Sequence, residues 1–123
     1  LLSHSEWLIM KAVWQLNRTT IREVLEELKD ETDWAYSTVK TMMERLEDKG
    51  YLSSKKVGGS RLYTARIPEE IVKGKATRGF LKQVFDGSIK SMVHCLVNER
   101  DLTDEEAAEL TKILKARKRE KKK

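Results

Sequence analysis

The pattern of residues 34–66, WAYSTVKTMMERLEDKGYLSSKKVGGSRLYTAR, constrains the fold of this chain more than any other feature. Apolar residues recur at helical spacing and predict an amphipathic helix over about residues 36–49, with the stripe Val39, Met42, Met43 and Leu46. Gly50 follows, where glycine commonly ends a helix. Residues 51–53 and 61–64 then read as short strands on either side of a Gly-Gly turn signal. The segment therefore predicts a helix followed directly by a β-hairpin.

Two further helices are expected before this segment. Residues 5–16 carry four apolar residues at helical spacing, with Ser3 or Ser5 as the cap: Trp7, Met10, Val13 and Trp14. Thr20 and Glu23 form a capping-box signature, and behind it lie Ile21, Val24, Leu25 and Leu28 at one face of a second helix. Three helices followed by a hairpin predict a mainly α chain that begins with a winged helix-turn-helix, the hairpin being the wing.

The charge distribution favours a nucleic-acid partner for this region more than the net charge does. The chain carries a formal charge of +5, but residues 115–123 alone hold seven basic residues and one acidic residue. Residues 1–33 hold four basic and seven acidic residues, whereas residues 34–66 hold seven basic and three acidic ones. Positive charge is therefore concentrated on the elements that would face phosphates. A lysine-rich end is typical of a solvated helix terminus, and we assign the tail no role.

The polar face of the helix at residues 36–49 is the candidate reading surface. Opposite the apolar stripe and on its shoulders lie hydroxyl, basic and acidic residues: Ser37, Thr38, Lys40, Thr41, Glu44, Arg45 and Asp48. Hydroxyls can exchange hydrogen bonds with base edges, and a lysine can reach a guanine edge or a phosphate. An ordinary solvated face is the alternative, which the two acidic residues favour. The hairpin adds three cations suited to the sugar-phosphate backbone, namely Lys55, Lys56 and Arg61.

Beyond Pro68 the pattern is purely helical. Helices are expected at about residues 69–85, 87–98 and 103–118, the last after a second capping-box signature. Three amphipathic helices of this size cannot bury their apolar faces alone, and pairing with a second copy is the simplest remedy. We therefore expect a winged-helix DNA-binding domain at residues 1–67 and a three-helix dimerisation region with a basic tail at 68–123. The expected dimerisation residues are Phe80, Val84, Ile89, Met92, Val93, Leu96, Leu110, Ile113 and Leu114.

Signals of catalysis are weak. His4 and His94 are the only histidines, and His94 lies on an apolar helical pattern where a structural role is expected. Cys95, the only cysteine, excludes an internal disulfide and a multi-cysteine metal site, and its position predicts a buried thiol. We expect no enzyme activity, no cofactor and no metal. No apolar run is long enough to span a bilayer, so no membrane insertion and a cytoplasmic location are expected.

The chain resembles the penicillinase-repressor family (BlaI/MecI/CopY type) from about Ser5 to Leu114. The resemblance is carried by SEWLIMKAVW, TIREVLEEL, DWAYSTVKTMMERLEDKGYL, the FDGS at residues 85–88 and DLTDEEAAELTKIL. The segment around Trp34 is the most specific of these. Family members often have Ser-Pro where this chain has Ala35-Tyr36, and a basic residue at the position of Ser37.

The resemblance implies a small dimeric winged-helix repressor of bacteria, with the helices after Pro68 forming an intertwined dimer. The base-contacting positions then fall on Ser37, Thr38, Lys40 and Thr41, and Arg45 falls on the DNA backbone. The operators of the family are pseudo-palindromes. In antibiotic-sensing members a membrane-bound sensor protease triggers cleavage of an Asn-Phe bond in the middle dimerisation helix, and the equivalent pair here is Cys95-Leu96.

Two functions follow as hypotheses. The first is a homodimeric, sequence-specific transcriptional repressor of antibiotic- or stress-responsive genes, released by cleavage or loss of its dimerisation half. Its partners would be double-stranded DNA, a second copy of the chain and a sensor protease. The alternative is a winged-helix module that docks a protein instead of DNA, since a polar helix face serves either role. A mobility shift with DNA from upstream of its own gene separates the two.

Overall fold

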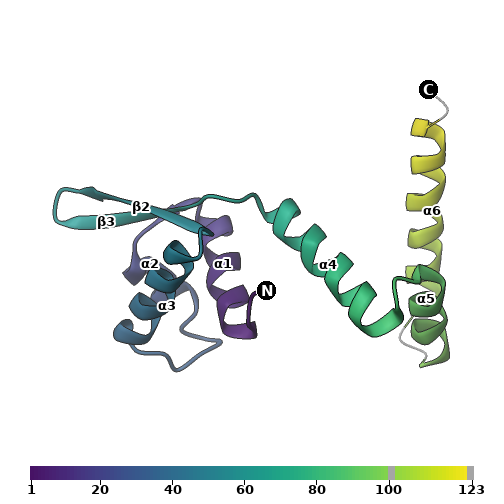
Figure 1. Ribbon diagram of the computed structural model, residues 1–123, viewed down its shortest axis with the longest axis horizontal. Coiled ribbons are helices and arrows are strands. Elements are labelled where there is room, and N and C mark those ends of the chain that lie inside the picture. Colours follow the sequence, from purple (N-terminus) through teal and green to yellow (C-terminus); the bar gives the residue numbers. More distant parts are fainter. Residues whose placement is uncertain (100–101, 122–123) are drawn as a thin grey trace. The chain divides into compact units, whose positions relative to one another are not determined.

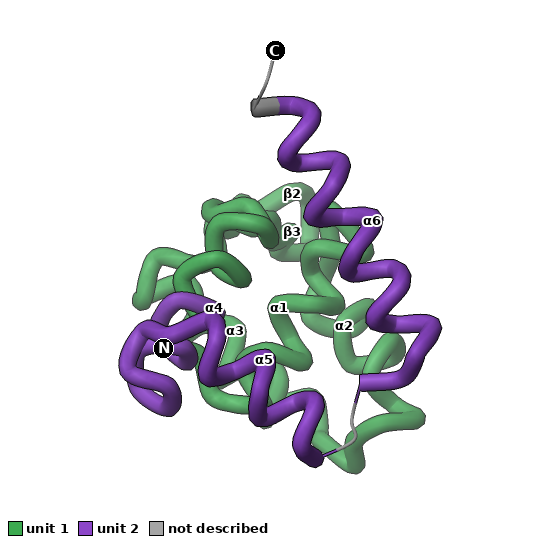
Figure 2. The backbone as a smooth tube through the Cα atoms, turned by 90° about the vertical axis from the view of Figure 1, so that its right-hand side faces the viewer, with its two compact units in different colours: residues 1–76 green, residues 77–123 purple. Residues whose placement is uncertain are grey.

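The computed structural model describes residues 1–99 and 102–121, which form two compact units, residues 1–76 and 77–123 (Figure 2). Unit 1 begins with α1 (His4–Leu16), whose N-terminus carries a capping box made by Ser3 and Glu6. Asn17 ends the helix with a positive φ of 72°, and its amide donates to the carbonyl oxygen of Val13 at 2.8 Å.

The predicted second helix is confirmed as α2 (Ile21–Glu27). Both bonds of the expected capping box are present, because the Glu23 amide donates to Thr20 Oγ1 at 3.1 Å and the Thr20 amide donates to Glu23 Oε1 at 3.0 Å. These bonds satisfy two amides that a helix start leaves without partners.

The predicted third helix is confirmed as α3 (Tyr36–Asp48). Lys49 caps it, and Gly50 follows with a φ of 89°, a left-handed conformation that glycine adopts without strain. The helix packs against α1 and α2 in the core of unit 1 (Figure 1). That core consists of Ile9, Met10, Ala12, Val13, Ile21, Val24, Leu28, Val39, Met43, Leu46, Leu52 and Tyr63.

The wing is formed by β2 (Leu52–Val57) and β3 (Ser60–Ala65), which pair antiparallel and are longer than the sequence predicts. They project from unit 1 as a long ribbon joined at Gly58 and Gly59 (Figure 1). A third strand, β1 (Arg18–Thr19), pairs with β3 to give the order β1-β3-β2. No strand was predicted between the first two helices, so β1 is an element that the sequence did not reveal. The wing is thereby anchored to the chain between α1 and α2.

The segment that follows the wing is tied to α1. The indole Nε1 of Trp14 donates to the carbonyl oxygen of Ile67 at 3.1 Å, and the Trp7 and Trp14 rings lie 6.1 Å apart between centroids. The helix α4 (Glu69–Phe85) then begins, and its first turns belong to unit 1, where Val72 is buried.

Unit 2 holds the remainder of α4, α5 (Ile89–Asn98) and α6 (Asp104–Lys121). The helix α5 starts two residues later than predicted, because Asp86 and Gly87 have positive φ values and Ser88 caps the helix through its side chain. The second predicted capping box is confirmed, since Thr103 and Glu106 exchange two hydrogen bonds of 3.1 Å. Among its described residues, unit 2 contains no fully buried hydrophobic side chain, so its helices expose their apolar faces in the single chain.

Candidate nucleic-acid interface

The outward face of α3 displays the polar residues that the sequence analysis assigned to base contact. All four side chains are exposed in the first half of the helix: Ser37, Thr38, Lys40 and Thr41. The inward face supplies three core residues that are fully buried, namely Val39, Met43 and Leu46. Packing of that inward face fixes which side of the helix points outward. The structure therefore brings the four residues together on one surface, as reading of a major groove requires.

The hydroxyl of Thr41 already has a partner within the helix. Its Oγ1 donates to the carbonyl oxygen of Ser37 at 2.9 Å. The proton is thus engaged, whereas the lone pairs of Oγ1 and the methyl group stay available to a ligand. Thr41 is therefore prepared to accept a hydrogen bond from a base amino group or to touch a thymine methyl.

A hydrogen-bond chain fastens the wing to the end of α3. Ser54 Oγ in β2 donates to Glu47 Oε2 at 2.7 Å, and a guanidinium NH of Arg61 in β3 donates to Ser54 Oγ at 3.0 Å. One serine thus links α3 to both strands of the hairpin. This chain limits how far the wing can swing relative to α3.

The three wing cations do not share one face. Lys56 lies directly opposite Arg61 in the ladder, whereas Lys55 lies opposite Leu62. Because successive side chains in a strand point to opposite faces, Lys56 and Arg61 are on one face and Lys55 is on the other. Like charges directly opposite each other are unfavourable in a sheet, so the Lys56–Arg61 pair would be stabilised by an anion.

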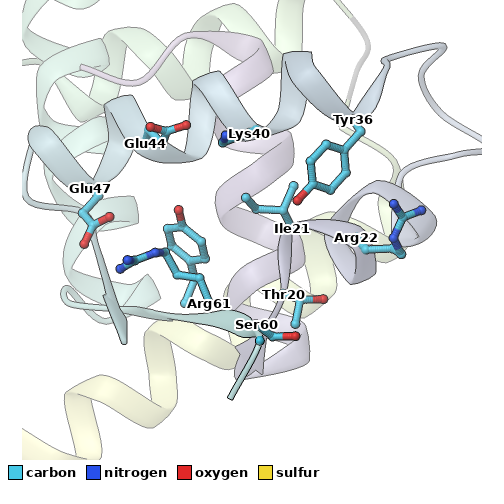
Figure 3. A pocket seen from close by; sticks show the side chains of 11 residues that line it. Thr20, Ile21, Arg22, Tyr36, Lys40, Glu44, Glu47, Ser60 and Arg61 are labelled. Atoms are coloured by element: carbon cyan, nitrogen blue, oxygen red, sulfur yellow. The ribbon is translucent and has the colours of Figure 1, made fainter. Parts of the chain in front are cut away.

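A hollow of about 580 Å³ separates α3 from the wing (Figure 3). It is lined by the start of α2, the outer side of α3 and the wing strand β3. Its lining residues are Thr20, Ile21, Arg22, Tyr36, Lys40, Glu44, Glu47, Gly59, Ser60, Arg61 and Tyr63. The hollow is polar, and it combines three cations with two carboxylates.

Tyr63 lies in the lining of this hollow with only 1% of its surface exposed. Burial raises the pKa of its phenol, and the carboxylates of Glu47 and Glu44 raise that pKa further against the opposing effect of Arg61. The phenol therefore stays uncharged well into the alkaline range.

The cations of this surface keep their charge available. In the described part of the chain, the ion pairs involve Lys29 with Glu26, Lys49 with Glu6, and Lys73 with Glu69. None of the exposed cations on α3 or the wing takes part in these pairs: Lys40, Arg45, Lys55, Lys56 and Arg61. A surface with unneutralised cations is a favourable place for phosphates.

Arg22 and Tyr36 line the hollow and were not among the sequence-based contact candidates. The guanidinium carbon of Arg22 in α2 lies 5.2 Å from the centre of the Tyr36 ring, which projects from the first turn of α3. The replacement of the family's proline by Tyr36 was the one sequence signal pointing to this contact. The partner at Arg22, fourteen positions earlier, gave no signal of its own.

Unit 2 exposes the residues expected to mediate dimerisation. Met92 and Val93 are half-buried, and seven others are between 37% and 64% exposed: Phe80, Val84, Ile89, Leu96, Leu110, Ile113 and Leu114. The expectation that the Cys95 thiol is buried is wrong for the single chain, where Cys95 is exposed, as is the neighbouring His94. A helical stripe identifies the apolar side of a helix, but burial requires a partner to cover that side.

Two kinds of feature were sought in residues 1–99 and 102–121, a metal site and a membrane-spanning helix. Within these ranges no three His, Cys, Asp or Glu side chains gather as a metal site would require. No helix there has the length and apolar character needed to cross a bilayer.

Comparison with known proteins places this surface in context. The penicillinase-repressor family model matches residues 2–116. The penicillinase repressor of Bacillus licheniformis is 33% identical over 121 residues, covering 98% of this chain and 94% of the relative. The methicillin resistance regulatory protein MecI of Staphylococcus aureus (strain N315) is 30% identical over 113 residues, covering 92% of each.

A solved structure is similar to part of this chain. The B. licheniformis BlaI monomeric form in complex with the blaP half-operator superposes with a TM-score of 0.51 at 34% identity. The match covers 57% of this chain and 85% of the BlaI chain. The family model matches nearly the whole sequence, and the similar solved structure is that of the repressor BlaI. The chain therefore belongs to the penicillinase-repressor family of DNA-binding transcriptional repressors.

Proposed function

We propose that this repressor binds a pseudo-palindromic operator as a homodimer and blocks transcription from an overlapping promoter. In each copy, α3 lies in a major groove and the wing lies on the adjacent backbone. The observation that carries the proposal is the exposed, unneutralised set of hydroxyls and cations on α3, held in place by a buried inward face.

The contacts divide by chemistry. Base edges are contacted by residues in the N-terminal half of α3, which enters the groove first: Ser37, Thr38, Lys40 and Thr41. The remaining cations bind phosphates and set the register: Arg45, Lys55, Lys56 and Arg61. The complex of BlaI with its half-operator supports this use of the surface.

A second copy of the chain covers the apolar side of unit 2. Exposed aliphatic and aromatic side chains on α4, α5 and α6 are too numerous for a stable free surface. Burying them against identical helices satisfies both copies through one symmetric contact. The dimer then presents two recognition helices to two half-sites about one or two helical turns apart.

The repressor is released from the operator when the dimer contact through unit 2 is lost. The peptide bond between Cys95 and Leu96 corresponds to the bond cleaved in antibiotic-sensing members, and both residues are exposed in the single chain. We propose that a sensor protease or another change within α5 separates the two copies. Each copy then retains only one half-site contact and binds weakly, because the advantage of two linked sites is lost.

A double substitution on α3 tests the proposed function. Lys40→Ala with Thr41→Ala removes one amine and one hydroxyl from the reading face while leaving the inward face intact. The matched control is Thr111→Ala with Lys112→Ala on α6, where Thr111 makes the same 2.9 Å hydrogen bond to the carbonyl four residues earlier. Binding to DNA from upstream of the gene is measured by mobility shift at rising salt.

We expect the α3 variant to lose at least about tenfold in affinity for its preferred duplex, since each good base contact is worth about 1–3 kcal/mol. The α6 control should bind as the wild type does. Equal binding by the two folded variants would exclude α3 as the reading helix. A folded wild-type chain that shifts no duplex would favour the protein-docking alternative.

A further inference from the structure

Arg22 and Tyr36 form a contact that the assigned roles of α3 and the wing leave unexplained. The guanidinium carbon of Arg22 lies 5.2 Å from the centre of the Tyr36 ring, within the range of a cation–π interaction. Figure 3 shows the Tyr36 ring reaching from α3 toward α2, with Arg22 beside it at the edge of the hollow. Both side chains are exposed, and Tyr36 keeps 41% of its surface in solvent.

Helix formation does not account for Tyr36. The residue occupies the first position of α3, where proline is favoured because its φ is already helical. Ala35 before it offers no side-chain cap. Tyrosine therefore contributes little to starting the helix, and what it adds at this position is an aromatic face.

A guanidinium that lies over an aromatic ring can bind an anion at the same time. A stacked arginine uses its flat face, so the N–H groups around its edge remain directed outward for bidentate contact with a phosphate. The ion pairs of the described residues do not include Arg22. Its charge is therefore not compensated, and its side chain is partly ordered before any ligand arrives.

We propose that Arg22, positioned by Tyr36, binds a DNA phosphate at the N-terminal end of the recognition helix. This inference rests on the proposed function, because the phosphate belongs to the duplex that α3 enters. Arg22 and Arg61 line the same hollow from α2 and from β3. Two backbone contacts then border this hollow, one from α2 and one from the wing.

Tyr36 acts in this proposal as a positioning residue. Its ring lowers the entropy that Arg22 loses on binding, because fewer side-chain rotamers must be frozen. Its hydroxyl is not needed for that effect. Phenylalanine should therefore replace Tyr36, whereas alanine should not.

The test compares Arg22→Ala, Tyr36→Phe, Tyr36→Ala and the double variant Arg22→Ala with Tyr36→Ala. The control is Lys29→Ala, which removes one cation just beyond the C-terminal end of α2, where Lys29 is paired with Glu26. Each full-length variant is checked for its melting temperature. Each is then titrated by fluorescence anisotropy with two labelled probes of equal length: a duplex selected by the wild-type protein and a random-sequence duplex.

We expect Arg22→Ala to weaken binding to both probes by the same factor, about five- to twentyfold. The salt slope, which is the slope of log affinity against log salt concentration, should fall in magnitude by about 1. Tyr36→Phe should bind within about twofold of the wild type. Tyr36→Ala should weaken binding to both probes, but by less than Arg22→Ala does. The double variant should be no weaker than Arg22→Ala alone, because the ring acts through the guanidinium. Lys29→Ala should leave the salt slope unchanged.

Three results would overturn the inference. A folded Arg22→Ala variant with wild-type affinity and slope would mean that Arg22 only shields the ring. A loss confined to the selected duplex would make Arg22 a base reader. Additive losses from the two substitutions would remove Tyr36 as the positioning residue. Failure of the wild-type protein to bind either probe would instead reject the proposed function, so the two failures are distinguishable.

Discussion

Replacement of Ser54 by alanine tests whether the wing is held rigidly against α3. Ser54 Oγ donates to Glu47 at 2.7 Å and accepts from Arg61 at 3.0 Å, so the substitution removes two hydrogen bonds to charged groups. Such bonds contribute about 1.5–3 kcal/mol when they are well shielded. Because Arg61 is exposed and Ser54 only half-buried, we expect a combined loss of about 1–2 kcal/mol.

The adjacent residue in the same strand offers a matched control. Ser53 is also half-buried, but it lies on the opposite face of the wing, where its hydroxyl meets the Thr64 hydroxyl at 3.2 Å. That bond joins two neutral groups and contributes about 0.5–1 kcal/mol. Ser53→Ala therefore removes the same atoms from the same strand without loosening the wing from α3.

Thermal unfolding and DNA titration measure the two effects. A loss of 1 kcal/mol lowers the melting temperature of a domain of this size by about 4–8 °C, so Ser54→Ala should melt roughly 5–10 °C below the wild type. Its affinity for duplex DNA should fall about three- to tenfold, since a mobile wing loses more entropy on binding. Ser53→Ala should keep its affinity. Identical melting temperatures and affinities for the two variants would refute the reasoning.

Two further predictions concern the wing cations and the acid stability of unit 1. Lys55→Ala with Lys56→Ala should weaken binding to all duplexes and lower the salt slope by roughly 2, and an unchanged slope would exclude the wing from the interface. Burial tends to raise the pKa of Glu6, but hydrogen bonds from Lys49 and the Ser3 amide outweigh it and hold that pKa below 4.5. Its stabilising contribution is therefore present above that pH and is lost as the pH falls through the lowered pKa. The difference in melting temperature between wild type and Glu6→Gln should shrink on acidification, and parallel profiles would contradict this.

Local signals account for the parts of the fold that could be predicted. The capping box of Thr20 and Glu23, the apolar stripe of α3 and the Gly-Gly turn of the wing each depend on residues close in sequence. The strand β1 could not be found in this way, because two residues carry no period. It exists because β3 supplies a paired edge for Arg18 and Thr19.

Contacts between elements limited the prediction of the interface. The exposed face of α3 follows from the helical period, so its polar residues could be named from the sequence. The link from Glu47 through Ser54 to Arg61 depends on how the wing leaves α3, and the cation–π contact of Arg22 with Tyr36 depends on how α2 meets α3. The spacing of residues within one helix or strand predicts neither of these two contacts.

The apolar pattern of α5 also does not reveal which contacts the helix makes. It correctly marks the apolar face of the helix, yet the inference that Cys95 is buried failed in the single chain. The pattern indicates that the apolar face of α5 needs a partner. Which surface packs against that face depends on the assembly. Burial of Cys95 by a second copy belongs to the proposed dimer.

Hydroxyl-radical footprinting on DNA from upstream of the gene tests the central claim most directly. If two copies, joined through unit 2, place their α3 helices in successive grooves, protection appears as two symmetric half-sites on one face of the duplex, spaced by about one or two helical turns. A single unsymmetric patch, or protection that survives Lys40→Ala with Thr41→Ala unchanged, would contradict the account.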